Sequence, residues 1–181
     1  MKLVIIRYPE TNKVAHLSGE PEIPSPKGRQ QLLQLAEICQ QEKVKAVAHS
    51  ILPRTTAASE VLAGSLDVPS ILIEGLQERN FGDWAKWEWP QISSHLSKLP
   101  TEARYTFAPP HGESWQEMDV RLNAALRDIA ALGLDSVAVM THASCIRVLL
   151  VLIRGAPKES VLKLVPALGG SFIEDYNPPV V

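Results

Sequence analysis

The sequence predicts an α/β domain in which helices cover both faces of a mostly parallel sheet. Short apolar runs rich in β-branched residues alternate along the chain with segments whose apolar residues recur at helical spacing. The run Val137–Met140 is apolar throughout, as expected of a strand that is covered on both faces. The chain has 181 residues, of which 45% are hydrophobic and 21% charged, and this fits one globular domain over residues 1–181.

Each expected element follows from its own residue pattern. Five short apolar runs are expected to form strands, the last of them at an edge of the sheet: residues 3–6, 44–48, 71–73, 137–140 and 172–173. Five segments with helical spacing are expected to form helices: residues 27–42, 53–63, 91–98, 113–132 and 145–153. Residues 74–111 hold Trp84, Trp87 and Trp89, and we expect this Trp-rich segment to leave the sheet and cover one end of the fold.

Composition excludes several classes of protein. There are 18 Lys and Arg against 20 Asp and Glu, and a net charge of −2 argues against a nucleic-acid partner. The two cysteines, Cys39 and Cys145, form neither a disulfide framework nor a zinc set. The apolar start of the chain is too short for a signal peptide, and the run Ile146–Ile153 is interrupted by Arg147 and too short to span a bilayer. We therefore expect a cytoplasmic protein with no membrane partner.

Cationic side chains follow three of the expected strands. Arg7 ends the first strand, Arg54 lies one turn into the helix after the second, and His142 follows the fourth. In parallel sheets of this kind the ligand site lies beyond the carboxyl ends of the strands, so these three side chains are expected to converge. Guanidinium groups match phosphate oxygens bidentately, and an imidazole can donate to a third oxygen. The sequence therefore predicts a phosphate site.

Five short segments occur in an order that is typical of one family. They are Arg7-Tyr8-Pro9-Glu10-Thr11, Ser50-Ile51-Leu52-Pro53-Arg54, Leu76-Gln77-Glu78-Arg79-Asn80-Phe81-Gly82-Asp83-Trp84, Gly112-Glu113-Ser114 and Val139-Met140-Thr141-His142-Ala143. In this order the chain resembles the histidine phosphatase superfamily, which has the phosphoglycerate mutase-like fold, from about residue 3 to about residue 155. The Gly112-Glu113-Ser114 segment is most similar to the α-ribazole phosphatase branch. The resemblance implies a three-layer α/β/α sandwich.

The resemblance also implies a role for each matching residue. In the family a His of the first motif attacks phosphorus, and paired arginines, here Arg7 and Arg54, hold the phosphoryl oxygens. A second His, here His142, stabilises the charge on those oxygens, and an acid, here Glu78, protonates the leaving oxygen. This mechanism needs no metal and no other cofactor. Three further residues are candidates for contact with the substrate: Arg79, Trp84 and His111.

Tyr8 stands where the resemblance places the nucleophilic His. A phenol has an ordinary pKa near 10, so only about one part in a thousand is phenolate at pH 7. The phenol oxygen also lies farther from the backbone than an imidazole nitrogen, so we expect the Tyr8 side chain to fill the pocket rather than attack phosphorus. His49 or His16 is an alternative nucleophile or base, although only one of His49 and Ser50 can point into the cleft because strand residues alternate.

Three functions are compatible with these residues. The leading hypothesis is a family member that binds a phosphate monoester or inorganic phosphate through Arg7, Arg54 and His142 with little or no turnover. The first alternative is an active phosphatase of altered mechanism, similar to α-ribazole phosphatase. The second is a protein-interaction module in which the Trp-rich segment is the working surface.

Overall fold

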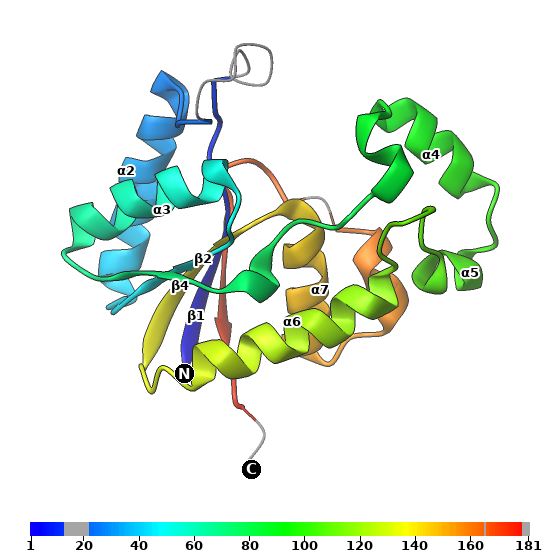
Figure 1. Cartoon of the computed structure of the whole chain (residues 1–181). Coiled ribbons are helices and arrows are strands. Elements are labelled where there is room, and N and C mark those ends of the chain that lie inside the picture. Colours follow the sequence, from blue (N-terminus) through cyan, green and yellow to red (C-terminus); the bar gives the residue numbers. More distant parts are fainter. Residues whose placement is uncertain (13–21, 165, 179–181) are drawn as a thin grey trace.

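A computed structural model describes residues 1–12, 22–164 and 166–178. Its centre is a five-stranded sheet in the order β3-β2-β4-β1-β5 (Figure 1). The strands are β1 (Lys2–Arg7), β2 (Val47–His49), β3 (Ser70–Leu72), β4 (Ser136–Thr141) and β5 (Ser171–Asp175). The first four are parallel to one another, and β5 pairs with β1 in the antiparallel direction at the edge.

Four helices cover the sheet. Helices α2 (Pro26–Gln41) and α3 (Pro53–Leu66) pack on one face, and α6 (Trp115–Ala130) and α7 (Ala143–Arg154) pack on the other. The expected three-layer α/β/α sandwich is therefore confirmed. Helices α4 (Trp89–Ser97) and α5 (Thr101–Thr106) stand away from the sheet at one end of the molecule (Figure 1). Three short 3-10 helices complete the described part of the chain: η1 (Glu74–Leu76), η2 (Gly82–Lys86) and η3 (Lys158–Leu162).

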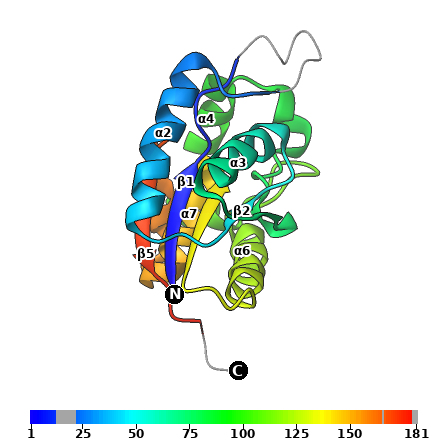
Figure 2. The same ribbon diagram turned by 90° about the vertical axis from the view of Figure 1, so that its left-hand side faces the viewer.

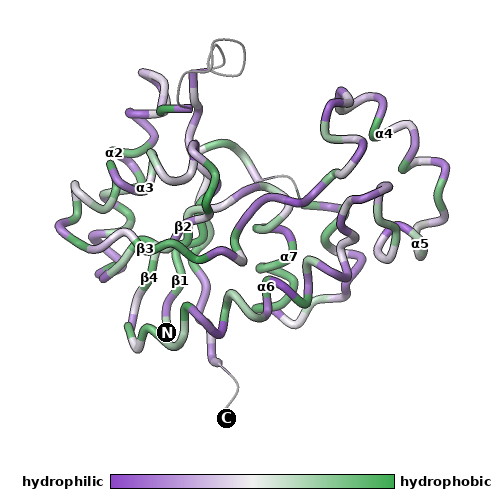
Figure 3. The backbone as a smooth tube through the Cα atoms, in the orientation of Figure 1, coloured by the Kyte–Doolittle hydropathy of each residue, from purple (hydrophilic) through white to green (hydrophobic). Residues whose placement is uncertain are grey.

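The core is divided into two layers by the alternation of side chains along the strands. In β1, Leu3 and Ile5 face α6 and α7, whereas Val4 and Ile6 face α2 and α3, and all four are fully buried. Because both faces are covered, every residue in the middle of the strand is apolar. Figure 3 shows this concentration of hydrophobic residues along the central strands.

Most expected elements are confirmed, with shifts at their ends. The expected helix 113–132 begins at Trp115, because the Ser114 hydroxyl accepts a hydrogen bond from the Glu117 N–H and so caps the helix. The second strand lies later than expected, at Val47–His49 instead of 44–48, so it ends directly before Ser50. Helix α5 was not expected from the sequence, since it has only six residues and no apolar periodicity.

The carboxyl ends of the parallel strands share one end of the sheet. The amino terminus, where β1 begins, lies at the bottom of both ribbon views, and α4 lies at the opposite end (Figure 2). The Trp-rich segment, residues 74–111, therefore stands at the end of the sheet where a ligand site is expected. Within the described residues, no helix is both long and apolar enough to cross a membrane.

Candidate functional site

The pairing of β1 with β4 places Tyr8 beside His142. Arg7, the last residue of β1, lies opposite Thr141, the last residue of β4. Tyr8 and His142 directly follow these two strands. The Tyr8 N–H donates to the Thr141 carbonyl at 3.1 Å. The two rings then meet edge to face, with centroids 5.4 Å apart and planes inclined by 60°. The strand register alone therefore brings two residues from distant parts of the chain into contact.

Two guanidinium groups converge on the Tyr8 ring. The Arg54 Cζ atom lies 5.0 Å from the ring centroid and the Arg7 Cζ atom lies 5.8 Å from it, within the range of cation–π contacts. One nitrogen of each group is already used, because Arg7 Nη1 donates to the Pro166 carbonyl at 2.5 Å and Arg54 Nη1 pairs with Glu22 at 3.2 Å. The Nε atoms of both arginines are buried and have no hydrogen-bond partner in the part of the chain that is described.

A chain of buried hydroxyl groups sets the tautomer of His142. The Thr55 hydroxyl has one hydrogen and lies 2.7 Å from the Leu52 carbonyl and 3.0 Å from the Ser50 carbonyl, so it donates to a carbonyl. The Ser50 hydroxyl, 2.7 Å from Thr55 Oγ1, then donates to Thr55. Ser50 Oγ is left as the acceptor for His142 Nε2, also at 2.7 Å. We assign the hydrogen of the neutral imidazole to Nε2 on this basis.

The other nitrogen of His142 is free to meet a ligand. Nδ1 is buried and makes no hydrogen bond within residues 1–12, 22–164 and 166–178. Burial lowers the pKa of His142 to about 3, and the positive charges of Arg54, Arg7 and Arg121 act in the same direction. His142 is therefore neutral at pH 7 in the unliganded site. A bound anion would reverse the sign of the local field and favour the protonated ring, which donates from Nδ1.

Glu78 is held close to this site by contacts of its neighbours. The Thr141 hydroxyl donates to the Leu76 carbonyl at 2.7 Å, and the Cys145 thiol donates to the Gln77 carbonyl at 2.9 Å. These bonds attach the segment after η1 to the end of β4 and the start of α7. The half-buried Glu78 carboxylate accepts from the Arg79 main-chain N–H at 2.8 Å. Its position is therefore determined by the same elements that position His142.

A cavity of about 480 Å³ opens next to Arg7 and reaches as far as α4 and α5. This volume lies in the usual range for small-molecule sites. Four arginines and one glutamate are among its lining residues, together with apolar side chains from α4, α6 and η3. The lining residues are Arg7, Glu78, Arg79, Phe81, Ser93, Leu96, Ser97, Arg104, Trp115, Ala143, Ser144, Arg147 and Leu162.

Arg79, a predicted substrate contact, lies in the wall of this cavity and is only 4% exposed. Its Nε donates to the Glu113 carbonyl at 2.7 Å and its Nη2 donates to the Phe107 carbonyl at 3.2 Å. The guanidinium also lies 4.7 Å from the centroid of the Trp115 ring. Burial lowers the pKa of Arg79 to about 10, while the charge of Glu113 opposes the shift. Arg79 therefore remains cationic at pH 7.

Two predicted substrate contacts lie outside the cavity wall. Trp84 is 7% exposed and stacks on Trp87 with centroids 4.9 Å apart, inside the Trp-rich segment. His111 is exposed and lies 3.1 Å from an Asp83 carboxylate oxygen. The Trp-rich segment instead reaches the cavity through Glu78, Arg79 and Phe81, through residues of α4, and through Arg104 of α5.

Of the two alternative nucleophiles, His49 is the one within the described residues, and its ring is turned to the main chain and not to His142. His49 is buried, and its Nδ1 contacts the carbonyl of Ser50 at 2.8 Å, while the Ser50 side chain is the one that reaches His142. The other alternative, His16, lies outside the described residues.

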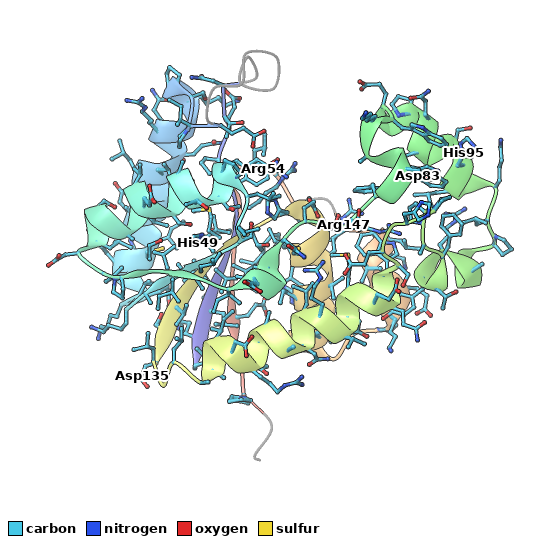
Figure 4. The ribbon with its side chains drawn as sticks, in the orientation of Figure 1. His49, Arg54, Asp83, His95, Asp135 and Arg147 are labelled. Carbon is cyan, nitrogen blue, oxygen red and sulfur yellow. The ribbon has the colours of Figure 1, made fainter. Side chains whose placement is uncertain are left out.

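The structure adds residues that the sequence analysis did not assign to the site. Arg147 and Arg104 line the cavity, and Ser50 orients His142. A signal for Arg147 was present, because it is the cation that interrupts the apolar run Ile146–Ile153. In Figure 4, Arg54 and Arg147 both lie in the central region between the α2–α3 side and the α4–α5 side of the molecule.

Comparison with known proteins assigns the chain to a family. The family model described as histidine phosphatase superfamily (branch 1) matches residues 3–173. The chain belongs to this superfamily. Among its relatives is the probable phosphoglycerate mutase GpmB of Shigella boydii, which is 26% identical over 171 residues; the match covers 91% of this chain and 80% of the relative.

Solved structures of two phosphatases have the same fold as this superfamily member. The α-ribazole phosphatase from Shigella flexneri matches with a TM-score of 0.75 at 20% identity, and the match covers 98% of this chain and 91% of the phosphatase chain. A mycobacterial glucosyl-3-phosphoglycerate phosphatase in complex with VO3 matches with the same TM-score of 0.75 at 20% identity, over 95% and 90% of the two chains. At this level of identity the likeness establishes the fold alone.

Across the described ranges, no group of three or more His, Cys, Asp or Glu side chains is arranged to hold a metal ion.

Proposed function

We propose that this protein binds a phosphate monoester or inorganic phosphate through Arg7, Arg54 and His142, and that it turns substrate over slowly or not at all. One observation carries the proposal. The Nε atoms of Arg7 and Arg54 and the Nδ1 atom of His142 are buried and have no hydrogen-bond partner among the described residues. Buried polar groups are normally satisfied, so the two Nε–H donors favour an anionic ligand, and Nδ1 becomes a third donor when the bound anion favours the protonated ring.

Tyr8 is the reason to expect little turnover. Its ring lies next to both guanidinium groups and against His142, where an attacking group would be needed. Phenols are almost fully protonated at neutral pH, and a protonated oxygen is a poor nucleophile. Within the described residues the Tyr8 hydroxyl makes no hydrogen bond, so none of those residues acts on it as a base. We infer that the phenol donates to a bound anion and does not attack it.

An active phosphatase, similar to α-ribazole phosphatase, is the second candidate. It is favoured by Glu78, which lies in the wall of the cavity that begins at Arg7. A carboxylic acid in this place can protonate the leaving oxygen of an ester whose alcohol part occupies the cavity. The protein-interaction hypothesis draws less support, because Trp84 is buried within its own segment instead of forming an exposed surface.

Calorimetric titration with inorganic phosphate tests the binding proposal. We expect Arg54→Ala to abolish binding while the far-UV circular dichroism spectrum stays unchanged. Arg127→Ala is the matched control, because Arg127 is an exposed arginine on α6. Equal phosphate affinity in the wild type and in Arg54→Ala would exclude Arg54 as a ligand.

Hydrolysis of p-nitrophenyl phosphate tests the turnover proposal. We expect the wild type to be inert, Tyr8→His to gain activity, and Tyr8→His/His142→Ala to lose it again. Tyr8→Phe is the control that keeps the ring and removes the hydroxyl. Turnover by the wild type that disappears in Tyr8→Phe would show that the phenol takes part in catalysis and would favour the active phosphatase.

A further inference from the structure

Gln31 lies near the start of α2 and bridges two loops beside the phosphate site. Its Oε1 atom accepts a hydrogen bond from the Glu10 main-chain N–H at 2.9 Å, and its Nε2 atom donates to the Leu168 carbonyl, also at 2.9 Å. Glu10 lies in the segment after β1, whereas Leu168 lies in the loop before β5. One half-buried amide therefore joins two segments that are far apart in the chain.

The loop before β5, residues 166–170, is also bonded to Arg7. The Pro166 carbonyl accepts a hydrogen bond from Arg7 Nη1 at 2.5 Å. On the main chain, the Arg7 N–H donates to the Gly170 carbonyl at 3.0 Å, and the Gly169 N–H donates to the Arg7 carbonyl at 3.2 Å. The loop therefore fixes both the backbone of Arg7 and one nitrogen of its guanidinium group.

Two glycines let the main chain approach Gln31 closely. Gly169 has φ +67°, and a Cβ atom there would lie 2.7 Å from Gln31 Cδ and 2.9 Å from Gln31 Nε2. Gly28 lies three positions before Gln31 on α2, and a Cβ atom there would lie 2.0 Å from the Glu10 carbonyl oxygen. A residue with a side chain at either position would push the loops and the helix apart. The amide of Gln31 is therefore tightly enclosed between the two loops.

This arrangement bears on how Arg7 meets a ligand. Arg7 Nη1 is occupied by the Pro166 carbonyl, whereas Arg7 Nε is buried and has no hydrogen-bond partner among the described residues. Ordering a long side chain when a ligand binds reduces the affinity, and a side chain that is already fixed avoids this loss. A loop that holds Arg7 in place before the anion arrives therefore strengthens binding.

We propose that Gln31 is a positioning residue for anion binding. By holding the loop 166–170, it keeps the Pro166 carbonyl on Arg7 Nη1 and so directs the remaining donors of this guanidinium toward phosphate. Gln31 acts through Arg7 and is not itself a ligand. The inference rests on the proposed function, in which Arg7 binds the phosphate.

The test uses matched variants of two neighbouring glutamines on α2. Gln31→Met removes both hydrogen bonds and keeps the length of the side chain, whereas Gln31→Glu keeps the acceptor for the Glu10 N–H and loses the donor to Leu168. Gln30→Met and Gln30→Glu make the same chemical changes at the exposed position next to it. Calorimetry measures the affinity for inorganic phosphate, and ¹⁵N NMR relaxation measures the mobility of the Arg7 Nε–H without phosphate.

We expect both Gln31 variants to bind inorganic phosphate about two- to tenfold more weakly than the matching Gln30 variants, because ordering one long side chain costs about this much. In the same variants the Arg7 Nε–H should become more mobile. The Arg54 Nε–H should stay as in the wild type, because Arg54 is held by its ion pair with Glu22. A merely structural role of Gln31 would change both arginine signals or neither.

Four outcomes would contradict the reasoning, and they can be told apart. If either the phosphate affinity or the Arg7 mobility is the same in the Gln31 and Gln30 variants, the inference is wrong and the proposed function stands. If the Arg7 and Arg54 signals change together, Gln31 supports the fold in general. If Gln31→Glu behaves as the wild type and Gln31→Met does not, the contact with Glu10 is responsible instead of the loop 166–170.

The fourth outcome is that the wild type binds no phosphate. The proposed function then fails, whereas the NMR signals of the unliganded protein still show whether Gln31 fixes Arg7. Gln31→Glu keeps one of the two hydrogen bonds, so it decides the test if Gln31→Met does not fold.

Discussion

His142 makes the stability of the protein depend on pH in a way that one substitution can isolate. The ring is fully buried, and burial with the nearby arginines lowers its pKa from 6.5 to about 3. Between these two values the unfolded chain binds a proton that the folded chain does not, so the free energy of unfolding falls as the pH falls. One pKa unit corresponds to about 1.4 kcal/mol, so at about pH 5, some 1.5 units below the unfolded value, the loss is about 2 kcal/mol.

The assay is urea denaturation near pH 7.5 and near pH 5 in phosphate-free buffer, on the wild type and on His142→Gln. Glutamine has no charge change in this range, and its amide nitrogen can keep the hydrogen bond to Ser50 Oγ that His142 Nε2 makes. The remaining histidines are common to both proteins, so their contributions cancel. The wild type should lose about 2 kcal/mol more than the variant on going to about pH 5.

A second measurement follows from the same reasoning. Inorganic phosphate stabilises the folded state if it binds there, and it should do so with uptake of a proton by His142. Near pH 6, added phosphate should therefore raise the free energy of unfolding of the wild type by more than it raises that of His142→Gln.

The urea experiment without phosphate can refute the reasoning. If the wild type and His142→Gln have the same dependence of stability on pH, His142 is not a buried neutral group and the tautomer derived from Ser50 is wrong.

Two matched pairs of substitutions test the surroundings of the site. Ser50→Ala removes the acceptor of the buried His142 N–H and should lower the free energy of unfolding by about 1–3 kcal/mol. Ser59→Ala removes a buried hydroxyl with no partner in the described residues, so its free energy of unfolding should be nearly unchanged. Equal losses for the two variants in urea denaturation would contradict the assignment of Ser50 as the acceptor. Gly82→Ala should lower Tm, because Gly82 has φ +52° and a Cβ there would lie 2.1 Å from a carbonyl oxygen. Gly64→Ala on α3, where a Cβ meets no atom within 4 Å, should raise Tm, and the same sign for both would refute this reasoning.

The parallel strands and their covering helices were predictable because burial acts on each segment separately. A strand such as β1 must be apolar on both faces, and a helix such as α6 must be apolar on one stripe, so both leave a periodic pattern in the chain. Helix α5 leaves no such pattern. It is supported by tertiary contacts instead, among them the 2.8 Å hydrogen bond from the Tyr105 hydroxyl to Asp119 of α6.

The candidate site was predictable in part for the same kind of reason. Arg7, Arg54 and His142 each follow a strand, and the carboxyl ends of parallel strands always meet at one end of a sheet. The family motifs then distinguished these residues from the other arginines and histidines. Trp84 and His111 lie in a segment outside the sheet, so strand pairing does not fix their positions. Neither of them lines the cavity.

By itself, then, the sequence determined the fold class, the family and the strand ends at which the cationic residues stand. It did so because local periodicity and short motifs are properties of neighbouring residues. The tertiary structure alone decided that the Ser50 hydroxyl accepts from His142, that two guanidinium groups contact the Tyr8 ring, and that Arg147 faces a cavity instead of a carboxylate. These are contacts between segments far apart in the chain, and hydrogen bonds and charges are matched only once folding has brought those segments together.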